Sequence, residues 1–509
     1  MDIGMLEPRE CFKWFAAIAA IPRCSNNEQG ISDWLVTFAG VRDLFVCQDQ
    51  AGNICIRKPA SKGMENAPAV ILQGHMDMVC VKKNGSLFDF RASPIALRTD
   101  GEWLRADGTT LGADNGIAVA FILALLDSKD IPHPPLEAVI TVEEEVGMNG
   151  AAVFDVSLLS GSFFINLDSE KEGVFCTSCA GGRRSMVSLP APSVAVSDIP
   201  GLDGYRFFRI TLGGLAGGHS GIDIEKQRGN ANRLMGRALG VLLAKYDGYL
   251  AHIAGGTAMN VIPSSCSAEV LLACDTDTLN RELGVLCGMF RRELLASDGS
   301  GLSLAAEPAS GRDTVFARDV LPRVVAALTL LPDGVVSMDL NMTAQRLVES
   351  SSNLAVVATE EDAVVITCLT RSSVESRKIF ICDQIGTVAS LLGATVAIDG
   401  DHPAWQYAPE SKLRDVFRET YAALFGREAK VEGVHAGLEC GLFLEKFRNL
   451  GMEVDCIALG PTITGAHTVN EAVEISSVGN TWKLLLEVLR RLGDGEVKAI
   501  SPRTIPGVP

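Results

Sequence analysis

A histidine and an aspartate stand two residues apart at the end of an apolar run, as His75 and Asp77 in the segment QGHMDMV. On an extended backbone, side chains at i and i+2 share a face, so Asp77 can accept a hydrogen bond from one ring nitrogen of His75. That bond leaves the other ring nitrogen for a metal ion. Taken alone, the pattern is more typical of a surface pair, and it becomes informative only together with other ligands.

Acidic residues recur where a predicted strand ends or a predicted helix begins. Asp114 lies in GADNG before an apolar helix, Glu143, Glu144 and Glu145 follow the strand LEAVITV, and Asp168 ends the segment FFINLD. Taken singly, Asp114 is explained by a helix N-cap and the three glutamates by a solvated turn. In an open α/β sheet, however, the carboxyl ends of the strands meet in one crevice, where such residues converge.

His467 supplies a second imidazole in the glycine-punctuated segment GPTITGAHT, after the apolar run EVDCIALG. Two imidazoles and three carboxylates suit Zn²⁺, and a bridging carboxylate lets five side chains hold two ions. Such a pair of ions activates water and polarises a carbonyl, while a glutamate that is not a ligand takes the proton of the water. Neighbouring glutamates fit this division because adjacent side chains point in different directions.

The elements that must position these residues alternate between strands and helices. Two helices are predicted over about 9–40, the second opened by a capping box from Ser25 to Glu28. Hydrophobic patterning predicts a helix from 114 to 126 and strands at 69–73, 136–142 and 163–168. The alternation predicts an α/β fold, with a layered sheet flanked by helices on both faces.

The pattern of predicted strands and helices changes after Gly181 and Gly182. From about 186 to 400, strands such as RFFRITLGG alternate with helices such as NANRLMGRALGVLLAKY, which predicts an inserted α+β domain. The insert is as long as two small domains, so two related halves are an open alternative. The predicted organisation is a catalytic domain over 1–185 and 401–493, an inserted domain over 186–400, and a flexible tail over 494–509.

Composition narrows the classes of partner. Acidic residues outnumber basic ones by 62 to 45, and the net charge of −17 disfavours nucleic acid and anionic membrane surfaces. Apolar runs such as 117–126 are too short to span a membrane. The first residues lack the basic and apolar regions of a signal peptide, so we expect a cytoplasmic protein whose 14 cysteines are free thiols.

Competing motifs lack the residues that their chemistry needs. The glycine-rich segment 213–221 has no Gly-Lys-Ser/Thr ending of a phosphate-binding loop, and Ser220 is not framed as Gly-x-Ser-x-Gly because Ile222 stands in the last place. Cys176 and Cys179 form the only Cys-x-x-Cys pair in the sequence, and without a second pair they are interpreted as packed thiols.

Together these motifs resemble the bacterial cytosolic aminoacyl-histidine dipeptidases, also called Xaa-His or β-alanyl-histidine dipeptidases, of the di-zinc exopeptidase superfamily. The resemblance covers nearly the whole chain and runs in order through QGHMDMV, DGEWLRADGTTLGADNGIA, EEVGMNGA, NLDSEKEG, GGHSG, GNANRL, HAGLECGLF and GPTITGAHT. It implies a zinc-exopeptidase catalytic domain with a mixed sheet, and it makes the insert a lid, for which two ferredoxin-like halves are one alternative.

The resemblance implies two zinc ions per subunit, with Co²⁺ or Mn²⁺ as substitutes. Five residues match the ligand positions: His75, Asp114, Glu145, Asp168 and His467. In such enzymes the position of Asp114 bridges the ions, the position of Asp77 orients His75, and Glu144 matches the general base. The family pattern Glu-Glu-x-Gly falls on 144–147 and leaves Glu143 outside the site. Related enzymes also carry a cis peptide at the Asp114–Asn115 bond.

The resemblance further implies contacts with the substrate. Six residues match such positions: His219 at the oxyanion, Asn260 and Arg371 at the backbone and carboxylate, and His435, Gly437 and Glu439 near the amino end. A cap on a glycine loop remains the alternative for His219, and an ion pair on a strand face remains the alternative for Arg371. A homodimer formed through the lid domain is also open, as is a lid that delivers His219 within one chain.

The implied function is hydrolysis of dipeptides with a free amino end, including Xaa-His dipeptides, so small peptides are the expected partners. Deacylation of N-acyl amino acids, which uses the same metal centre in sister families, is the alternative among enzymes. A catalytically inactive peptide-binding protein is the alternative from another class. The intact Glu144 favours an enzyme, because a binding protein has no need of a general base.

Overall fold

The computed structural model describes residues 3–341 and 345–496 of the chain. The chain divides into two compact units: unit 1 comprises Met1–Ser178, Tyr407–Gly433 and Leu438–Pro509, and unit 2 comprises Cys179–Gln406 and Val434–Gly437. Unit 2 contains the whole segment predicted as the insert, 186–400, and the domain bounds given above stay a prediction. Most of the predicted tail, from 497 on, lies outside the described residues.

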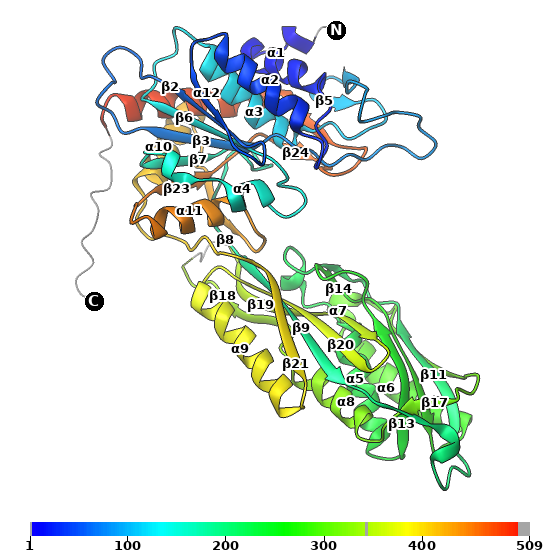
Figure 1. The fold of residues 1–509 in the computed structure, drawn as a ribbon. Coiled ribbons are helices and arrows are strands. Elements are labelled where there is room, and N and C mark those ends of the chain that lie inside the picture. The colour runs from blue at the N-terminus through cyan, green and yellow to red at the C-terminus, as the bar shows by residue number, and fades with distance from the viewer. Residues whose placement is uncertain (1–2, 342–344, 497–509) are drawn as a thin grey trace, which may run out of the picture. The chain divides into compact units, whose positions relative to one another are not determined.

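Unit 1 is built on an eight-stranded mixed sheet with the order β1-β2-β6-β3-β7-β23-β8-β22 (Figure 1). The strands β6, β3, β7 and β23 are parallel neighbours, and all of their residues are buried. Strands of a parallel sheet are covered on both faces, which explains why their sequences are continuous apolar runs. The eight strands are β1 (Phe45–Gln48), β2 (Ile54–Lys58), β3 (Val70–His75), β6 (Leu136–Thr141), β7 (Phe163–Asn166), β8 (Val174–Cys179), β22 (Lys430–Val434) and β23 (Asp455–Ala458).

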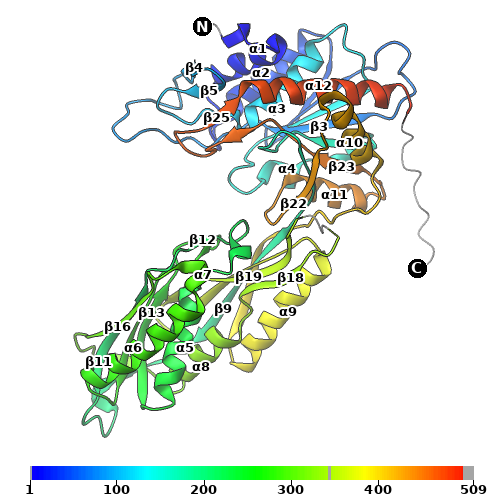
Figure 2. The ribbon, with the colours of Figure 1, turned by 180° about the vertical axis from the view of Figure 1, so that it is seen from behind.

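Helices cover both faces of this sheet. Neighbouring residues of β7 show the division, because Phe163 packs into the main core of unit 1 while the Phe164 ring lies 5.2 Å from that of Phe443 on the opposite face. Figures 1 and 2 show α1, α3 and α12 together on one side and α4 and α11 on the other. The helices are α1 (Arg9–Ala19), α2 (Gln29–Gly40), α3 (Ala113–Asp127), α4 (Asn149–Val153), α10 (Lys412–Phe425), α11 (Glu439–Asn449) and α12 (Ile475–Gly493).

Short elements complete unit 1. A four-stranded sheet has the order β24-β25-β5-β4 and joins the chain before α3 to the chain before α12. The members are β4 (Leu97–Thr99), β5 (Trp103–Ala106), β24 (Ile463–Thr464) and β25 (Ala472–Glu474), with the 3-10 helices η1 (Ile3–Met5) and η2 (Val156–Leu158). The Asp114–Asn115 peptide bond is cis, as the resemblance implied.

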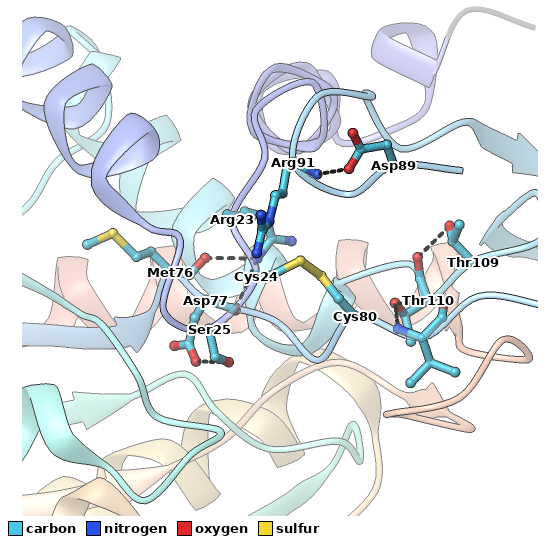
Figure 3. Close-up of a disulfide and its surroundings, with 11 residues drawn as sticks. Arg23, Cys24, Ser25, Met76, Asp77, Cys80, Asp89, Arg91, Thr109 and Thr110 are labelled. Carbon is cyan, nitrogen blue, oxygen red and sulfur yellow. Dashed lines mark hydrogen bonds between the residues drawn. A yellow bond between two sulfur atoms is a disulfide. The ribbon is translucent and has the colours of Figure 1, made fainter. Parts of the chain in front are cut away.

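Two expectations for the first 80 residues were wrong. The helix α2 has no side-chain cap, and the Ser25 hydroxyl donates instead to Asp77 at 2.8 Å, so there is no capping box. Cys24 and Cys80 form a disulfide (Figure 3), whereas the other 12 cysteines, including Cys176 and Cys179, belong to no disulfide, as expected. A backbone bridge between Cys24 and Met78 brings Cys24 close to Cys80.

Unit 2 is organised around one antiparallel sheet with the order β16-β11-β15-β13-β19-β20-β9-β21, to which β18 adds beside β19. Its first half runs β11 (Arg206–Gly213), α5 (Ala231–Leu243), β13 (Gly248–Gly255), β15 (Cys266–Leu272), α6 (Thr276–Glu293) and β16 (Ser303–Pro308). Numbered along the chain, these four strands lie in the order 4-1-3-2, which is the ferredoxin-like βαββαβ arrangement.

The second half repeats the arrangement around the first. It runs β9 (Gly181–Pro190), α8 (Val320–Leu330), β19 (Val348–Thr359), β20 (Ala363–Ser372), α9 (Glu375–Leu391) and β21 (Thr395–His402), with the first half inserted between β9 and α8. The strands β13 and β19 join the halves into one sheet. The α+β insert with two ferredoxin-like halves is therefore confirmed.

The helices α5, α6, α8 and α9 enclose a single apolar core against the sheet of unit 2. Smaller elements border this sheet: β10 (Ser193–Ala195), β12 (Gly218–His219), β14 (Val261–Ile262), β17 (Thr314–Phe316), β18 (Gly334–Met338), α7 (Leu295–Asp298), η3 (Val196–Asp198) and η4 (Ile224–Lys226). Across residues 3–341 and 345–496, none of the helices combines the length and apolarity needed to cross a bilayer.

Candidate metal centre

The predicted metal ligands converge at the carboxyl ends of the central parallel strands of unit 1. His75 is the last residue of β3, Glu145 follows β6, and Asp168 follows β7. His467 lies in the loop between β24 and β25, the next elements after β23, and Asp114 lies in the first turn of α3. Because β6, β3, β7 and β23 are adjacent and parallel, residues far apart in sequence meet at this edge of the sheet.

Asp114 lies between the two histidines. Its Oδ1 is 3.2 Å from His75 Nε2, and its Oδ2 is 3.2 Å from His467 Nε2. Asp168 Oδ1 lies 3.6 Å from His75 Nε2, and Glu145 Oε2 lies 3.0 Å from His467 Nε2. Two groups of three potential ligands therefore share Asp114, and within each group the ligand atoms lie within 4.8 Å of one another.

This donor set fits two divalent cations. Each group offers one imidazole and two carboxylates, which is a combination that zinc accepts. Glu145 Oε1 is buried and has no hydrogen-bond partner among the described residues. A buried carboxylate oxygen without a partner costs free energy that a cation would offset. The assignment of the five side chains as metal ligands stays a prediction that this geometry supports.

Protons compete with cations for this site. Burial by itself would lower the pKa of His75, but Asp168, Asp114 and Asp77 outweigh it and hold that pKa well above its usual value. Hydrogen bonds with Asp114 and Glu145 raise the pKa of His467 to about 11. Nε2 of each histidine faces Asp114, so in a protonated imidazole this nitrogen carries a proton that metal uptake must displace.

Asp77 contacts both the histidine and the glutamates of the site. It is fully buried, and its Oδ1 lies 3.2 Å from His75 Nδ1, on the ring edge opposite Asp114. Its carboxylate also accepts hydrogen bonds from the backbone N–H of Glu144 at 3.1 Å and of Glu145 at 3.2 Å. The predicted orientation of His75 is consistent with this contact, and the hold on the glutamate backbone is a further role that the sequence did not indicate.

Glu144 lies beside the two ligand groups. Its carboxylate is grouped with His75 and Glu145, so it faces the same space as the ligands. Burial, and then the nearby carboxylates such as Asp168, raise the pKa of Glu144 well above its usual value. Glu143 has a left-handed backbone and accepts a hydrogen bond from Asn149 at 3.0 Å. The Glu144 carboxylate is therefore grouped with potential ligands while that of Glu143 contacts Asn149, and the roles of the two glutamates stay predictions.

Glu439, predicted near the substrate's amino end, lies in unit 1 at the start of α11. It is 1% exposed and accepts hydrogen bonds from Gln73 and from Thr141, the latter at 2.9 Å. Burial raises its pKa to about 7. Its Oε1 has no partner among the described residues, so one oxygen remains for the predicted contact.

The other predicted substrate contacts lie in unit 2. His219 Nδ1 accepts the backbone N–H of Gly221 at 3.2 Å and of Ile222 at 3.1 Å, so it does cap the glycine loop. This places the ring proton on Nε2, which is then available as a donor. Asn260 is exposed, and its backbone carbonyl accepts the N–H of Ser220 at 2.8 Å.

Arg371 belongs to a row of residues that crosses the sheet of unit 2. It lies opposite Ser351 of β19 and Gly182 of β9, and Gly182 in turn lies opposite His402 of β21. Arg371 is 8% exposed and makes no ion pair with any described residue, which excludes the expected alternative within that part of the chain. His435 Nε2 lies 2.7 Å from Ser351 Oγ. A buried guanidinium without an acid suits a ligand carboxylate.

Sequence reasoning missed three residues around these sites. His402 joins the row of Arg371 only through strand register, which no local motif encodes. Arg23 and Glu471 bind the backbone beside the predicted metal ligands. The one available signal was the position of Glu471, four residues after His467 in the segment GAHTVNE. Gly437 is half-buried in unit 2, near His435 in the chain.

Comparison with known proteins places the chain in a family. Residues 71–491 match peptidase family M20/M25/M40. The chain is 38% identical to the cytosol non-specific dipeptidase of Escherichia coli (strain K12), over 96% of this chain and 99% of that protein. Among solved structures it resembles the aminoacylhistidine dipeptidase from Vibrio alginolyticus, with a TM-score of 0.87 and 37% identity over 96% of this chain and 98% of that one. The aminopeptidase PepT from Bacillus cereus shares the fold, with a TM-score of 0.56 and 15% identity over 96% and 100% of the two chains. The chain therefore belongs to peptidase family M20/M25/M40.

Proposed function

We propose that the chain is a cytoplasmic metallo-dipeptidase that hydrolyses dipeptides with a free amino end, including Xaa-His dipeptides. The observation that carries this proposal is the pair of ligand groups that share Asp114, with Glu144 beside them. The relatives support the substrate class, because one is named a non-specific dipeptidase of the cytosol and another an aminoacylhistidine dipeptidase.

Two zinc ions are the proposed cofactors, with Co²⁺ or Mn²⁺ as substitutes. His75 and Asp168 would hold one ion, Glu145 and His467 the other, and Asp114 would bridge them, one oxygen toward each histidine. When bound, the ions supply Lewis acidity to the attacking water and to the scissile carbonyl. The carboxylates gathered around His75 and His467 support this proposal, because bound cations would offset the repulsion between their negative charges.

Glu144 is the proposed general base. Its carboxylate would take a proton from the attacking water and later donate it to the leaving amine. Between these two steps the carboxylate must hold the proton. The burial that raises its pKa favours the protonated form once the proton has moved. Of the two neighbouring glutamates, Glu145 is the proposed metal ligand, because its Oε2 lies 3.0 Å from His467 Nε2.

Residues of unit 2 are proposed to bind the substrate. His219 would donate its Nε2–H to the oxyanion, because Nδ1 is already an acceptor. Arg371 would bind the carboxylate of the substrate, because its buried guanidinium makes no ion pair within the described residues. Asn260, His435 and Gly437 complete the predicted set, together with Glu439 of unit 1 at the amino end.

A homodimer through unit 2 is proposed as the assembly. Three large apolar side chains on α9 and β21 support it, because Phe380 is 61% exposed, Leu391 80% and Ile398 51%. Analytical ultracentrifugation measures the state directly. A wild-type monomer at micromolar concentration would contradict the proposal, and Phe380→Glu is expected to dissociate a dimer.

The function is tested by substrate competition and by one isosteric variant. The zinc-loaded protein is expected to hydrolyse Ala-His and β-Ala-His, and turnover of only an N-acetyl amino acid would favour the deacylase alternative. Glu144→Gln is expected to keep two equivalents of zinc and to lose activity by about 10²–10⁴-fold. Its matched control is Glu143→Gln, which should stay within about threefold of wild type because the Glu143 carboxylate contacts Asn149 and belongs to none of the ligand groups. Full activity of Glu144→Gln would contradict the proposal.

A further inference from the structure

Arg23 is a buried cation that binds backbone carbonyl groups of two separate segments. Its side chain belongs to a residue that is 2% exposed. Nη1 donates to the carbonyl of Met76 at 3.0 Å and to that of Asp77 at 3.2 Å, and Nη2 donates to the carbonyl of Gly112. Figure 3 shows the guanidinium reaching from the chain before Cys24 to Met76. One side chain thus ties the end of β3 to the loop before α3.

Both of these segments carry predicted metal ligands. Met76 directly follows His75, and Gly112 stands two residues before Asp114. Backbone hydrogen bonds reinforce the first contact, since the Met78 N–H donates to the carbonyl of Arg23 at 3.1 Å. The distance between the two ligand-bearing segments is therefore set by a rigid, planar group rather than by the ligands alone.

Glu471 holds the second segment from its N–H side. Its carboxylate belongs to a residue that is 3% exposed. Oε2 accepts the N–H of Leu111 at 2.8 Å and of Gly112 at 3.0 Å, and Oε1 accepts the N–H of Ala113 at 2.7 Å and of Asp114 at 3.3 Å. Four consecutive N–H groups therefore end on one carboxylate, up to and including the residue predicted to bridge the metals.

The space around the guanidinium is built for an arginine. A Cβ atom added at Gly112 would lie 2.5 Å from Arg23 Nη2, and one added at Gly116 would lie 2.6 Å from it. Two glycines thus make room for a side chain that has no freedom to move aside. The opposite charges also offset each other, because Glu471 is the nearby acid that acts most strongly on Arg23.

We propose that Arg23 and Glu471 are positioning residues that set the separation of His75 and Asp114 before any metal binds. Neither side chain belongs to the ligand groups, so both act through the backbone that carries the ligands. Because Arg23 and Glu471 hold the two segments through backbone groups that a cation would not use, the binding energy of the metals is not spent on ordering the loop. The inference rests on the proposed metal centre, and it adds what fixes the geometry of that centre.

The consequence to be measured is metal affinity. Loss of a residue that orients metal ligands lowers affinity by about 10–100-fold, so Arg23→Met and Glu471→Gln are each expected to lose tenfold or more in zinc affinity. Both residues act on the same loop, so their effects on zinc affinity should not add. The double variant should bind zinc little more weakly than the single variant that has the lower affinity. The Co²⁺-loaded variants should show altered visible absorption, because that spectrum reports coordination geometry.

The experiment titrates zinc into metal-free protein in competition with a chromophoric chelator. Its matched control is Arg414→Met, because Arg414 is likewise buried, at 6% exposed, and donates to the carbonyl groups of Ala408 and Pro409 at 2.7 Å each, away from the ligand-bearing segments. This control should lose stability in urea and keep its zinc affinity within about threefold of wild type. If Arg23→Met does not fold, the isosteric Glu471→Gln carries the test.

Two results would overturn the inference. One is a zinc affinity within about threefold of wild type in both Arg23→Met and Glu471→Gln. The other is an equal loss of affinity in Arg414→Met, since the effect would then be general destabilisation. Failure of the proposed function gives different results: a wild-type protein that takes up no zinc removes the metal centre and this inference together, while one that takes up two ions and hydrolyses only N-acetyl amino acids removes the dipeptidase assignment alone.

Discussion

Removal of the Cys24–Cys80 disulfide should lower the free energy of unfolding of unit 1 by an amount that follows from the loop it closes. The two cysteines are 56 residues apart. The chain-entropy relation gives about 4 kcal/mol at 25 °C for a loop of that length, because the cross-link restricts the unfolded chain. The perturbation is the double variant Cys24→Ser and Cys80→Ser, which avoids reductants that bind zinc.

The assay is urea unfolding of the metal-free protein, followed by tryptophan fluorescence. Trp14, Trp34 and Trp482 lie in α1, α2 and α12, so they report on unit 1. Metal-free protein is needed because bound zinc would add its own stabilisation of the folded state. Cys47→Ser is the matched control, since Cys47 is a partly buried free cysteine of β1. It should change stability by less than about 1 kcal/mol.

A thiol count fixes the starting state. Denatured wild-type protein should titrate 12 free thiols out of 14 cysteines, because two are joined. The reasoning is refuted if all 14 react, or if the double variant unfolds within about 1 kcal/mol of the wild type at unchanged denaturant dependence.

Three further outcomes are expected. Zinc binding to the metal-free protein near pH 7 should release the protons of His75 and His467, because both pKa values are raised, that of His467 to about 11. Zinc affinity should therefore rise with pH, and calorimetry in buffers of different ionisation enthalpy counts the released protons. Asp77→Asn should lower zinc affinity by about 10–100-fold, measured by chelator competition, and an unchanged affinity would show that the contact with His75 does no orienting. Arg371→Met should raise KM for Ala-His by about 10–100-fold with kcat little changed, whereas an equal loss for Ala-His amide would show that Arg371 does not bind the carboxylate.

The sequence allowed the ligand set to be predicted because the residue types and their places were both informative. His75, Asp168 and the glutamates each follow an apolar strand, and parallel strands bring such positions to one edge. The resemblance added the pairing of the ligands. The distances around Asp114 agree with that pairing, since each of its oxygens faces a different histidine.

What the sequence did not reveal depends on contacts between distant segments. Arg23 and Glu471 bind backbone groups, which every residue has, so no spacing pattern marks their partners. Ser25 stands three residues before Glu28, as in a capping box. Its hydroxyl donates to Asp77 instead, because the folded chain brings this buried carboxylate within hydrogen-bond distance. Local rules cannot choose between two partners of which one is 52 residues away.

The disulfide was missed for a related reason. The expectation of free thiols came from the compartment, which governs cysteines on average. A particular pair is decided by geometry, and the backbone bridge between Cys24 and Met78 leaves the Cα atoms of Cys24 and Cys80 5.7 Å apart. That separation lies within the usual range for a disulfide.

The interrupted course of unit 1 along the chain has a consequence for synthesis on the ribosome. Four of the predicted metal ligands precede the insert, but His467 follows it, and β23 must enter the sheet beside β7 after Gln406 has emerged. The insert is nearly continuous and has its own core, so it can fold while the remainder is still being translated. A nascent or prematurely terminated chain therefore has no complete centre, and hydrolytic competence arises only when the last segment arrives.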